Sequence, residues 1–118
     1  MKKFPPLLFT TNEGRRIYQV PFFIEINGVT IKELVIDPHF EQKHGSYMND
    51  GKIYQIVQDL MIRKKRFVPA ERKAQWTIFE VDVPFQGKNY RLVFCLEDEK
   101  NYLEIIHCYR KSKYDSES

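Results

Sequence analysis

The stretch "QWTIFEVDVPFQGKNYRLVFCLEDEKNYLEIIHCYR", Gln75 to Arg110, decides the fold of this chain. It contains three segments in which apolar and polar residues alternate, and a period of two is typical of half-buried strands. Gln86-Gly87 and the sequence "EDEK", Glu97 to Lys100, separate these segments and predict two turns. We therefore expect a three-stranded antiparallel meander.

The two turns also predict a register for the meander. The first is read as a two-residue loop and the second as a four-residue loop, which places Leu103 opposite Phe94. Residues two apart share a face of a strand, so one face becomes apolar throughout, and a slip by one residue would break this pattern. The apolar face collects Phe79, Val81, Val83, Tyr90, Leu92, Phe94, Leu96, Leu103 and Ile105.

The same register distributes the polar residues near the end of the chain. His107 and Tyr109 continue the apolar face beyond Ile105, whereas Arg91 and Arg110 point to the other face. Aromatic and aliphatic residues also alternate with charges on that second face, and they would form a sizeable apolar patch if nothing covered them. These residues are Trp76, Ile78, Val93, Tyr102 and Ile106.

The N-terminal half of the chain predicts a hairpin followed by two helices. Asn27-Gly28 lies between two alternating segments and is the strongest short-range hairpin signal, because a type I′ turn needs positive φ at both central residues. Asp37-Pro38 is a typical helix start and Gly45 a typical end, which predicts one short helix. Asn49 or Asp50 then caps a longer helix. Its buried stripe comprises Ile53, Ile56, Val57, Leu60 and Met61.

This order of elements predicts an α+β fold. It consists of an N-terminal β-hairpin, one short and one longer helix, and a three-stranded antiparallel meander, with the helices packed on one face of the sheet. At 118 residues the chain is expected to form a single domain over residues 1–111. Residues 112–118 are expected to be a polar, disordered tail.

Composition narrows the class of protein without defining a function. Hydrophobic residues make up 42% of the chain and the net charge is +3, which permits binding to nucleic acid but does not demand it. No apolar run is long enough for a membrane span or an export signal, so a cytoplasmic protein is expected. Cys95 and Cys108 would lie too far apart for a disulfide and are expected to be buried or half-buried free thiols.

The last strand ends in "HCYRK", His107 to Lys111, and this cluster carries the first chemical hypothesis. Metal-free cleavage of RNA by transfer to the ribose 2′-hydroxyl needs a base, an acid and a cation that stabilises the charge on phosphorus. His107, Tyr109 and Arg110 can supply these groups, and histidine transfers protons near neutral pH. The alternative interpretation is structural, because polar residues are common where a strand meets water.

Two further groups of basic residues are candidates for RNA contact. The segment "HFEQKH" contains His39, Lys43 and His44, but its two histidines do not have the spacing of a zinc-binding helix, so no metal site is expected. The basic run "RKKR" comprises Arg63, Lys64, Lys65 and Arg66. It can grip an RNA backbone, or it can simply complement the C-terminal end of the helix dipole. No phosphate-binding loop or dinucleotide-binding motif is present, and no cofactor is expected.

Residues 31–111 resemble the RelE/BrnT-type group of small ribonuclease toxins. The resemblance is carried by "IDPHFEQKHGSYMNDGKIYQIVQDL", by "YRLVFCLEDEKNYLEIIHCYRK" and by the order of the elements. It implies a helical layer on a curved antiparallel sheet, RNA as the substrate and a cognate neutralising protein. His39, Lys43 and His44 match the basic opening helix of that group. Arg91 matches an arginine of the middle strand, and His107, Tyr109 and Arg110 match the last-strand cluster.

The leading hypothesis is a metal-independent endoribonuclease or a toxin-like relative of one. The resemblance implies His107 as general acid or base, Arg91 or Arg110 as a phosphate clamp, and Tyr109 as a stacking group or donor. The alternative is a non-catalytic interaction module, such as an accessory, immunity or antitoxin-like protein. Such a module would use the second sheet face to bind a partner or to form a homodimer.

Overall fold

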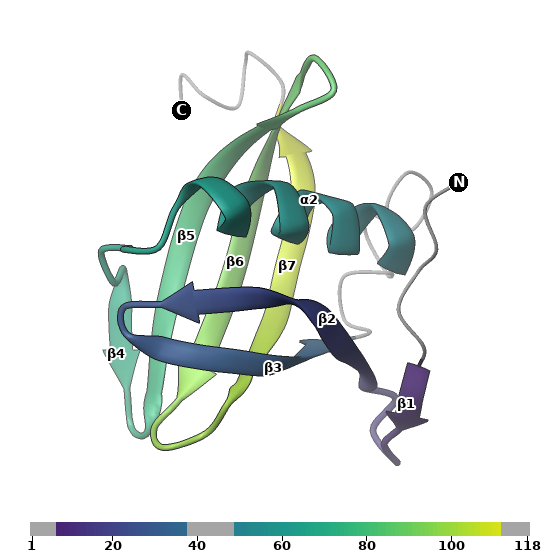
Figure 1. Cartoon of the computed structure of the whole chain (residues 1–118), viewed down its shortest axis with the longest axis vertical. Helices are drawn as coiled ribbons and strands as arrows, with labels where there is room; N and C mark the ends of the chain where they lie inside the picture. The colour runs from purple at the N-terminus through teal and green to yellow at the C-terminus, as the bar shows by residue number, and fades with distance from the viewer. Residues whose placement is uncertain (1–6, 38–48, 112–118) are drawn as a thin grey trace.

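The computed structural model describes residues 7–37 and 49–111, which form one seven-stranded sheet and one helix (Figure 1). The strands are β1 (Leu7–Thr10), β2 (Arg16–Ile26), β3 (Val29–Ile36), β4 (Glu71–Lys73), β5 (Trp76–Phe85), β6 (Lys88–Glu97) and β7 (Tyr102–Lys111), and the helix is α2 (Asp50–Arg63). The order in the sheet is β1-β2-β3-β7-β6-β5-β4. β3 and β7 run parallel, whereas the other neighbouring strands run antiparallel.

The predicted α+β fold, with two helices on an antiparallel sheet, is wrong. The described residues are mostly β, and the sheet is mixed because the hairpin joins the meander through a parallel pairing of Leu34 with Leu103. No local pattern encodes that long-range pairing. The edge strands β1 and β4 were also not expected, since three or four residues give too little alternation to detect. The predicted short helix up to Gly45 lies outside the described residues from Pro38 onward.

The hairpin and the longer helix are confirmed as separate elements. Asn27 and Gly28 have φ values of 49° and 86° and form the turn between β2 and β3. Asn49 caps α2, because its side chain accepts a 2.8 Å hydrogen bond from the backbone N–H of Lys52.

The core lies between α2 and the inner face of the sheet, which is the face that α2 crosses (Figure 1). The predicted stripe of α2 is buried there. Of the nine apolar residues predicted to share one face of the meander, only Val81 and Leu96 are partly rather than fully buried, and both pack against the core. Phe79 stacks on Phe94, with ring centroids 5.0 Å apart. The expected face of the meander is therefore confirmed.

The register between β6 and β7 differs from the prediction. Phe94 pairs with Ile105 rather than with Leu103, because β6 continues to Glu97 before the turn begins. This is a shift of two residues, which keeps every side chain before the bulge on its predicted face. Leu103 and Ile105, which precede the bulge in β7, are therefore buried as predicted, although the predicted pairing of β6 with β7 is wrong.

A β-bulge in β7 then changes the face that the end of the strand presents. The pairing slips at Ile106, and His107 pairs with Val93. After the bulge, Cys108 is buried in the core, whereas His107 and Tyr109 lie on the opposite face. The prediction that His107 and Tyr109 continue the apolar face is therefore wrong.

The cysteines are free and buried, as predicted. Cys95 pairs with Glu104, and Cys108 pairs with Leu92, so the two thiols lie on opposite faces of the sheet. This arrangement excludes a disulfide between them without rearrangement of the strands.

Candidate functional site on the outer face of the sheet

The outer face of the sheet, which is the face opposite α2, carries side chains in rows across β5, β6 and β7. Each row contains one residue from each strand, paired directly with its neighbours. Neighbouring strands lie about 4.8 Å apart, and neighbouring rows about 7 Å apart along a strand. The rows are Ile78–Cys95–Glu104, Glu80–Val93–His107 and Asp82–Arg91–Tyr109.

The row Glu80–Val93–His107, called the middle row below, contains two groups that can transfer a proton. Glu80 is exposed on β5 and His107 is half-buried on β7, with Val93 between them. Their Cα atoms are two strand spacings apart, roughly 10 Å. A carboxylate and an imidazole at that separation can act on opposite sides of a group bound over Val93.

Arg91 adds a cation beside the middle row. It donates from Nε to Asp82 at 3.0 Å, and its Nη1 lies 3.6 Å from Glu80 Oε1. This hydrogen bond raises the pKa of Arg91 and lowers the pKa of Asp82. Tyr109 is the direct partner of Arg91 on β7. Because of the bulge, His107 lies on the same face of the sheet as Arg91. The prediction that they lie on opposite faces is wrong.

An open pocket of about 360 Å³, called the outer pocket below, lies beside the middle row. Its charged end is built by Arg15, whose Nε lies 3.1 Å from Glu104 Oε2 and 3.8 Å from Asp37 Oδ2. One guanidinium therefore faces two carboxyl groups. Lys73, Trp76, Ile78, Ile106 and the thiol of Cys95 complete the lining.

Glu104 is the buried acid of the outer pocket, with only 5% of its surface exposed. Burial raises the pKa of Glu104, Arg15 lowers it, and the charge of Asp37 and its hydrogen bond to Glu104 raise it further. A titratable group perturbed by burial and by specific partners inside a pocket is a candidate for function, although structural ion pairs produce the same perturbation.

The apolar patch predicted for the second sheet face corresponds to this outer face. Its five members, Trp76, Ile78, Val93, Tyr102 and Ile106, are each half-buried. Trp76 packs edge-on against Tyr102, with ring centroids 6.4 Å apart. A homodimer or a cognate partner bound through this face stays a prediction.

The remaining predicted residues do not join the middle row. Arg110 pairs with Tyr90, a core residue, and is exposed at the end of β7 on the other side of the sheet. The prediction that Arg110 shares a face with Arg91 is therefore wrong. His39, Lys43 and His44 lie outside the described residues, so their contacts stay predictions.

The basic run Arg63–Arg66 lies at the end of α2, beside the β2–β3 turn. The backbone N–H of Asn27 donates to the carbonyl of Lys65 at 2.9 Å. Arg63 donates to Asp59, and Lys65 donates from Nζ to the carbonyl of Met61 at 3.1 Å. All four residues of the run are exposed. Since α2 packs on the inner face, the run is not placed together with His107.

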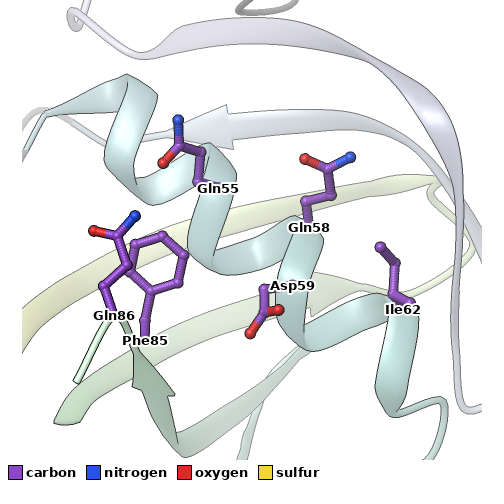
Figure 2. A pocket seen from close by; sticks show the side chains of 6 residues that line it. All are labelled: Gln55, Gln58, Asp59, Ile62, Phe85 and Gln86. Atoms are coloured by element: carbon purple, nitrogen blue, oxygen red, sulfur yellow. The ribbon is translucent and has the colours of Figure 1, made fainter. Parts of the chain in front are cut away.

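A second hollow, of about 340 Å³, lies between α2 and the turn after β5 (Figure 2). It is lined by Gln55, Gln58, Asp59, Ile62, Phe85 and Gln86. Figure 2 shows glutamine amides on both the helix and the turn, and amides can form hydrogen bonds but cannot transfer protons near neutral pH. Asp59 is bound to Arg63 at 3.1 Å. Asp59 is therefore the one carboxylate among the described residues that line this hollow, whereas the outer face combines carboxylates with the imidazole of His107.

Glu80, Asp37 and Arg15 were not predicted as site residues. The alternation in "FEVDV" places Glu80 on the face of Arg91, so a search for polar residues on that face would have found it. Arg15 and Asp37 meet Glu104 only through the long-range pairing of β3 with β7. No local signal in the sequence connects them.

Residues 7–37 and 49–111 contain no group of His, Cys, Asp and Glu that could hold a metal ion. In the same part of the chain, no helix is both long and apolar enough to cross a membrane. Comparisons with protein-family models, with curated proteins and with solved structures found no match. The resemblance to the RelE/BrnT-type group stays a prediction.

Proposed function

We propose that this protein is a metal-independent endoribonuclease whose reaction takes place over the middle row. The supporting observation is the β-bulge at Ile106. Because of this bulge, His107 and Tyr109 lie on the outer face, which also carries Glu80 and Arg91. Proton-transfer groups and a cation on one open face are what phosphodiester cleavage requires.

In the proposed reaction, the ribose 2′-oxygen attacks phosphorus and the bond from phosphorus to the 5′-oxygen breaks. Glu80 or His107 accepts the proton of the 2′-hydroxyl, and the other residue donates a proton to the leaving 5′-oxygen. The products are a 2′,3′-cyclic phosphate and a 5′-hydroxyl. Arg91 stabilises the negative charge that develops on the phosphoryl oxygens, and Tyr109 donates a hydrogen bond or stacks on a base.

The proposed site contains the cations Arg91 and Lys111 and the carboxylate Asp82, and the affinity for RNA is expected to depend on salt. Lys111 Nζ lies 3.3 Å from Asp82, so Asp82 binds Lys111 as well as Arg91. A bound phosphate would therefore share Arg91 and Lys111 with Asp82. Substrate binding is therefore expected to weaken as salt is raised, as for other phosphate contacts.

The test is cleavage of a fluorescent single-stranded RNA in the presence of a chelator, by the wild type and by His107→Ala, Glu80→Gln and Glu25→Gln. The first two substitutions are expected to lower the rate by about 10²- to 10⁴-fold, the usual contribution of a general acid or base. Glu25 lies on β2, outside the rows, and pairs with Thr30 of β3. Its substitution is therefore the matched carboxylate control and leaves the rate unchanged.

Circular dichroism shows whether each variant is folded, and identical purification of all four proteins controls for contaminating ribonuclease. Absence of cleavage by the wild type contradicts the proposed function. A folded His107→Ala variant with the full rate contradicts the proposed role of His107.

A further inference from the structure

The outer pocket adjoins the middle row directly. Cys95 and Glu104 belong to the row next to Val93 and His107, and the two rows are separated by about 7 Å along β6. Ile106, the extra residue of the bulge, also lines the pocket. A ligand in the pocket would therefore lie beside any group bound over the middle row.

The lining of the pocket defines the chemistry of a ligand. Trp76, Ile78 and Ile106 form apolar walls, and Trp76 is half-buried. At the charged end, Glu104 and Asp37 offer acceptor oxygens, and Arg15 is already bound to Glu104. This combination favours a flat ring that carries N–H donors.

Two other classes of ligand fit the pocket less well. A free phosphate could contact Lys73, but it would also meet the carboxyl groups of Glu104 and Asp37 and would compete with them for Arg15. A purely apolar ligand would displace water from the charged end without forming hydrogen bonds to the groups there, and this is unfavourable.

We propose that the outer pocket binds a nucleobase of the RNA substrate, with the ring stacked on Trp76 and its N–H groups donating to the carboxyl oxygens of Glu104 or Asp37. Proteins commonly bind single-stranded RNA by splaying a base onto an aromatic side chain and bonding its edge. The assignment rests on the proposed function, since it supplies the base next to the phosphate that lies over the middle row.

Trp76 provides a direct reporter, because it is the only tryptophan of the chain. The 3′-monophosphates of guanosine, adenosine, cytidine and uridine are titrated into the wild type while the fluorescence of Trp76 is followed. Ribose 5-phosphate is the control without a base. Saturable quenching by at least one nucleotide, and none by ribose 5-phosphate, is expected.

Variants then locate the binding site by equilibrium dialysis, which does not need the tryptophan. Trp76→Ala is expected to weaken binding of the quenching nucleotide by about 5- to 150-fold, the range for loss of one stacked base. Glu104→Gln is expected to weaken it as well, because the amide presents one acceptor oxygen instead of two. Phe85→Leu is the matched control, because Phe85 lines the other hollow and its substitution leaves binding unchanged.

The outcomes separate this inference from the proposed function. Nucleotide binding that Trp76→Ala weakens by the expected factor, without RNA cleavage by the wild type, supports the pocket and contradicts the ribonuclease. Cleavage without quenching by any of the four nucleotides contradicts the pocket. Equal quenching by ribose 5-phosphate also contradicts it, because the base would then contribute nothing.

Discussion

Arg91 on β6 donates a 3.0 Å hydrogen bond from Nε to Asp82, the residue directly opposite it on β5. The two side chains are 31% and 54% exposed, so water competes for both charges. Direct cross-strand pairs of opposite charge stabilise a sheet modestly. The Arg91–Asp82 pair is therefore expected to contribute little to the free energy of unfolding.

Asp82→Asn is expected to lower the free energy of unfolding by less than about 1 kcal/mol, the usual limit for exposed ion pairs. The difference from the wild type should shrink in 1 M salt, since screening acts on exposed charges. Urea denaturation at low and high salt measures both effects. A loss above about 2 kcal/mol, or one that salt does not change, would show that Asp82 supports the sheet in another way.

The predicted faces of the meander are confirmed up to the bulge, whereas the predicted pairing is correct between β5 and β6 and wrong between β6 and β7. Placing Leu103 opposite Phe94 was wrong by two residues, yet Leu103 and Ile105 are buried as expected. A period of two constrains the face of each residue but not its partner, so even-numbered slips cannot be detected from the pattern.

The face of His107 could not be predicted for a different reason. It depends on one extra residue, Ile106. The doublet Ile105-Ile106 interrupts the alternation at this point, but two adjacent apolar residues also occur in strands that have no bulge. Neither glycine nor proline marks the bulge. The junction of Arg15, Asp37 and Glu104 likewise depends on β3 pairing with β7, over a separation in sequence that local patterns do not reach.

Asp50 joins the start of α2 to β2 by hydrogen bonds. Of the polar substitutions considered, its removal is expected to lower the free energy of unfolding the most. It accepts hydrogen bonds from Arg16 Nε at 2.5 Å, Arg16 Nη2 at 2.9 Å and the hydroxyl of Tyr18 at 2.5 Å. Its side chain is 13% exposed. Burial, followed by the bond to Asp50, raises the pKa of Tyr18, so the hydroxyl stays protonated as a donor.

Asp50→Ala is expected to cost about 3 kcal/mol, because it removes the acceptor of a largely buried charged pair. Tyr18→Phe removes only one hydrogen bond and should cost about 1 kcal/mol. Chemical denaturation of both variants gives the comparison. Equal losses would mean that Arg16 contributes nothing through Asp50.

The two buried thiols should be unreactive in the folded protein. Burial raises the pKa of Cys95 to about 12 and that of Cys108 to about 12. At pH 8 only on the order of 1 in 10⁴ of each would be the reactive thiolate. Ellman's reagent is therefore expected to react slowly with the native protein and to modify both cysteines at once in denaturant. Rapid modification of one cysteine in the native protein would show that its strand opens readily.

Glu104 should make the stability of the protein depend on pH in an unusual direction. Its pKa in the folded state is raised above the ordinary value of 4.5, mainly by burial. As pH rises from that ordinary value through the raised one, the folded protein keeps a proton that the unfolded chain has lost. The free energy of unfolding therefore contains a contribution from Glu104 that is complete at low pH and is lost across this range.

Glu104→Gln removes this contribution, because an amide does not ionise. Substitution also changes the contact with Arg15, which adds an offset at every pH, so the informative quantity is the slope. Urea denaturation from pH 4 to pH 8 should show the variant gaining stability relative to the wild type as pH rises. Glu25→Gln, on β2 and outside the outer pocket, is the matched control substitution. A flat difference for Glu104→Gln would mean that the pKa of Glu104 is the same in the folded and the unfolded state. A falling difference would mean that Arg15 holds Glu104 ionised in the pocket and that its pKa is lowered rather than raised.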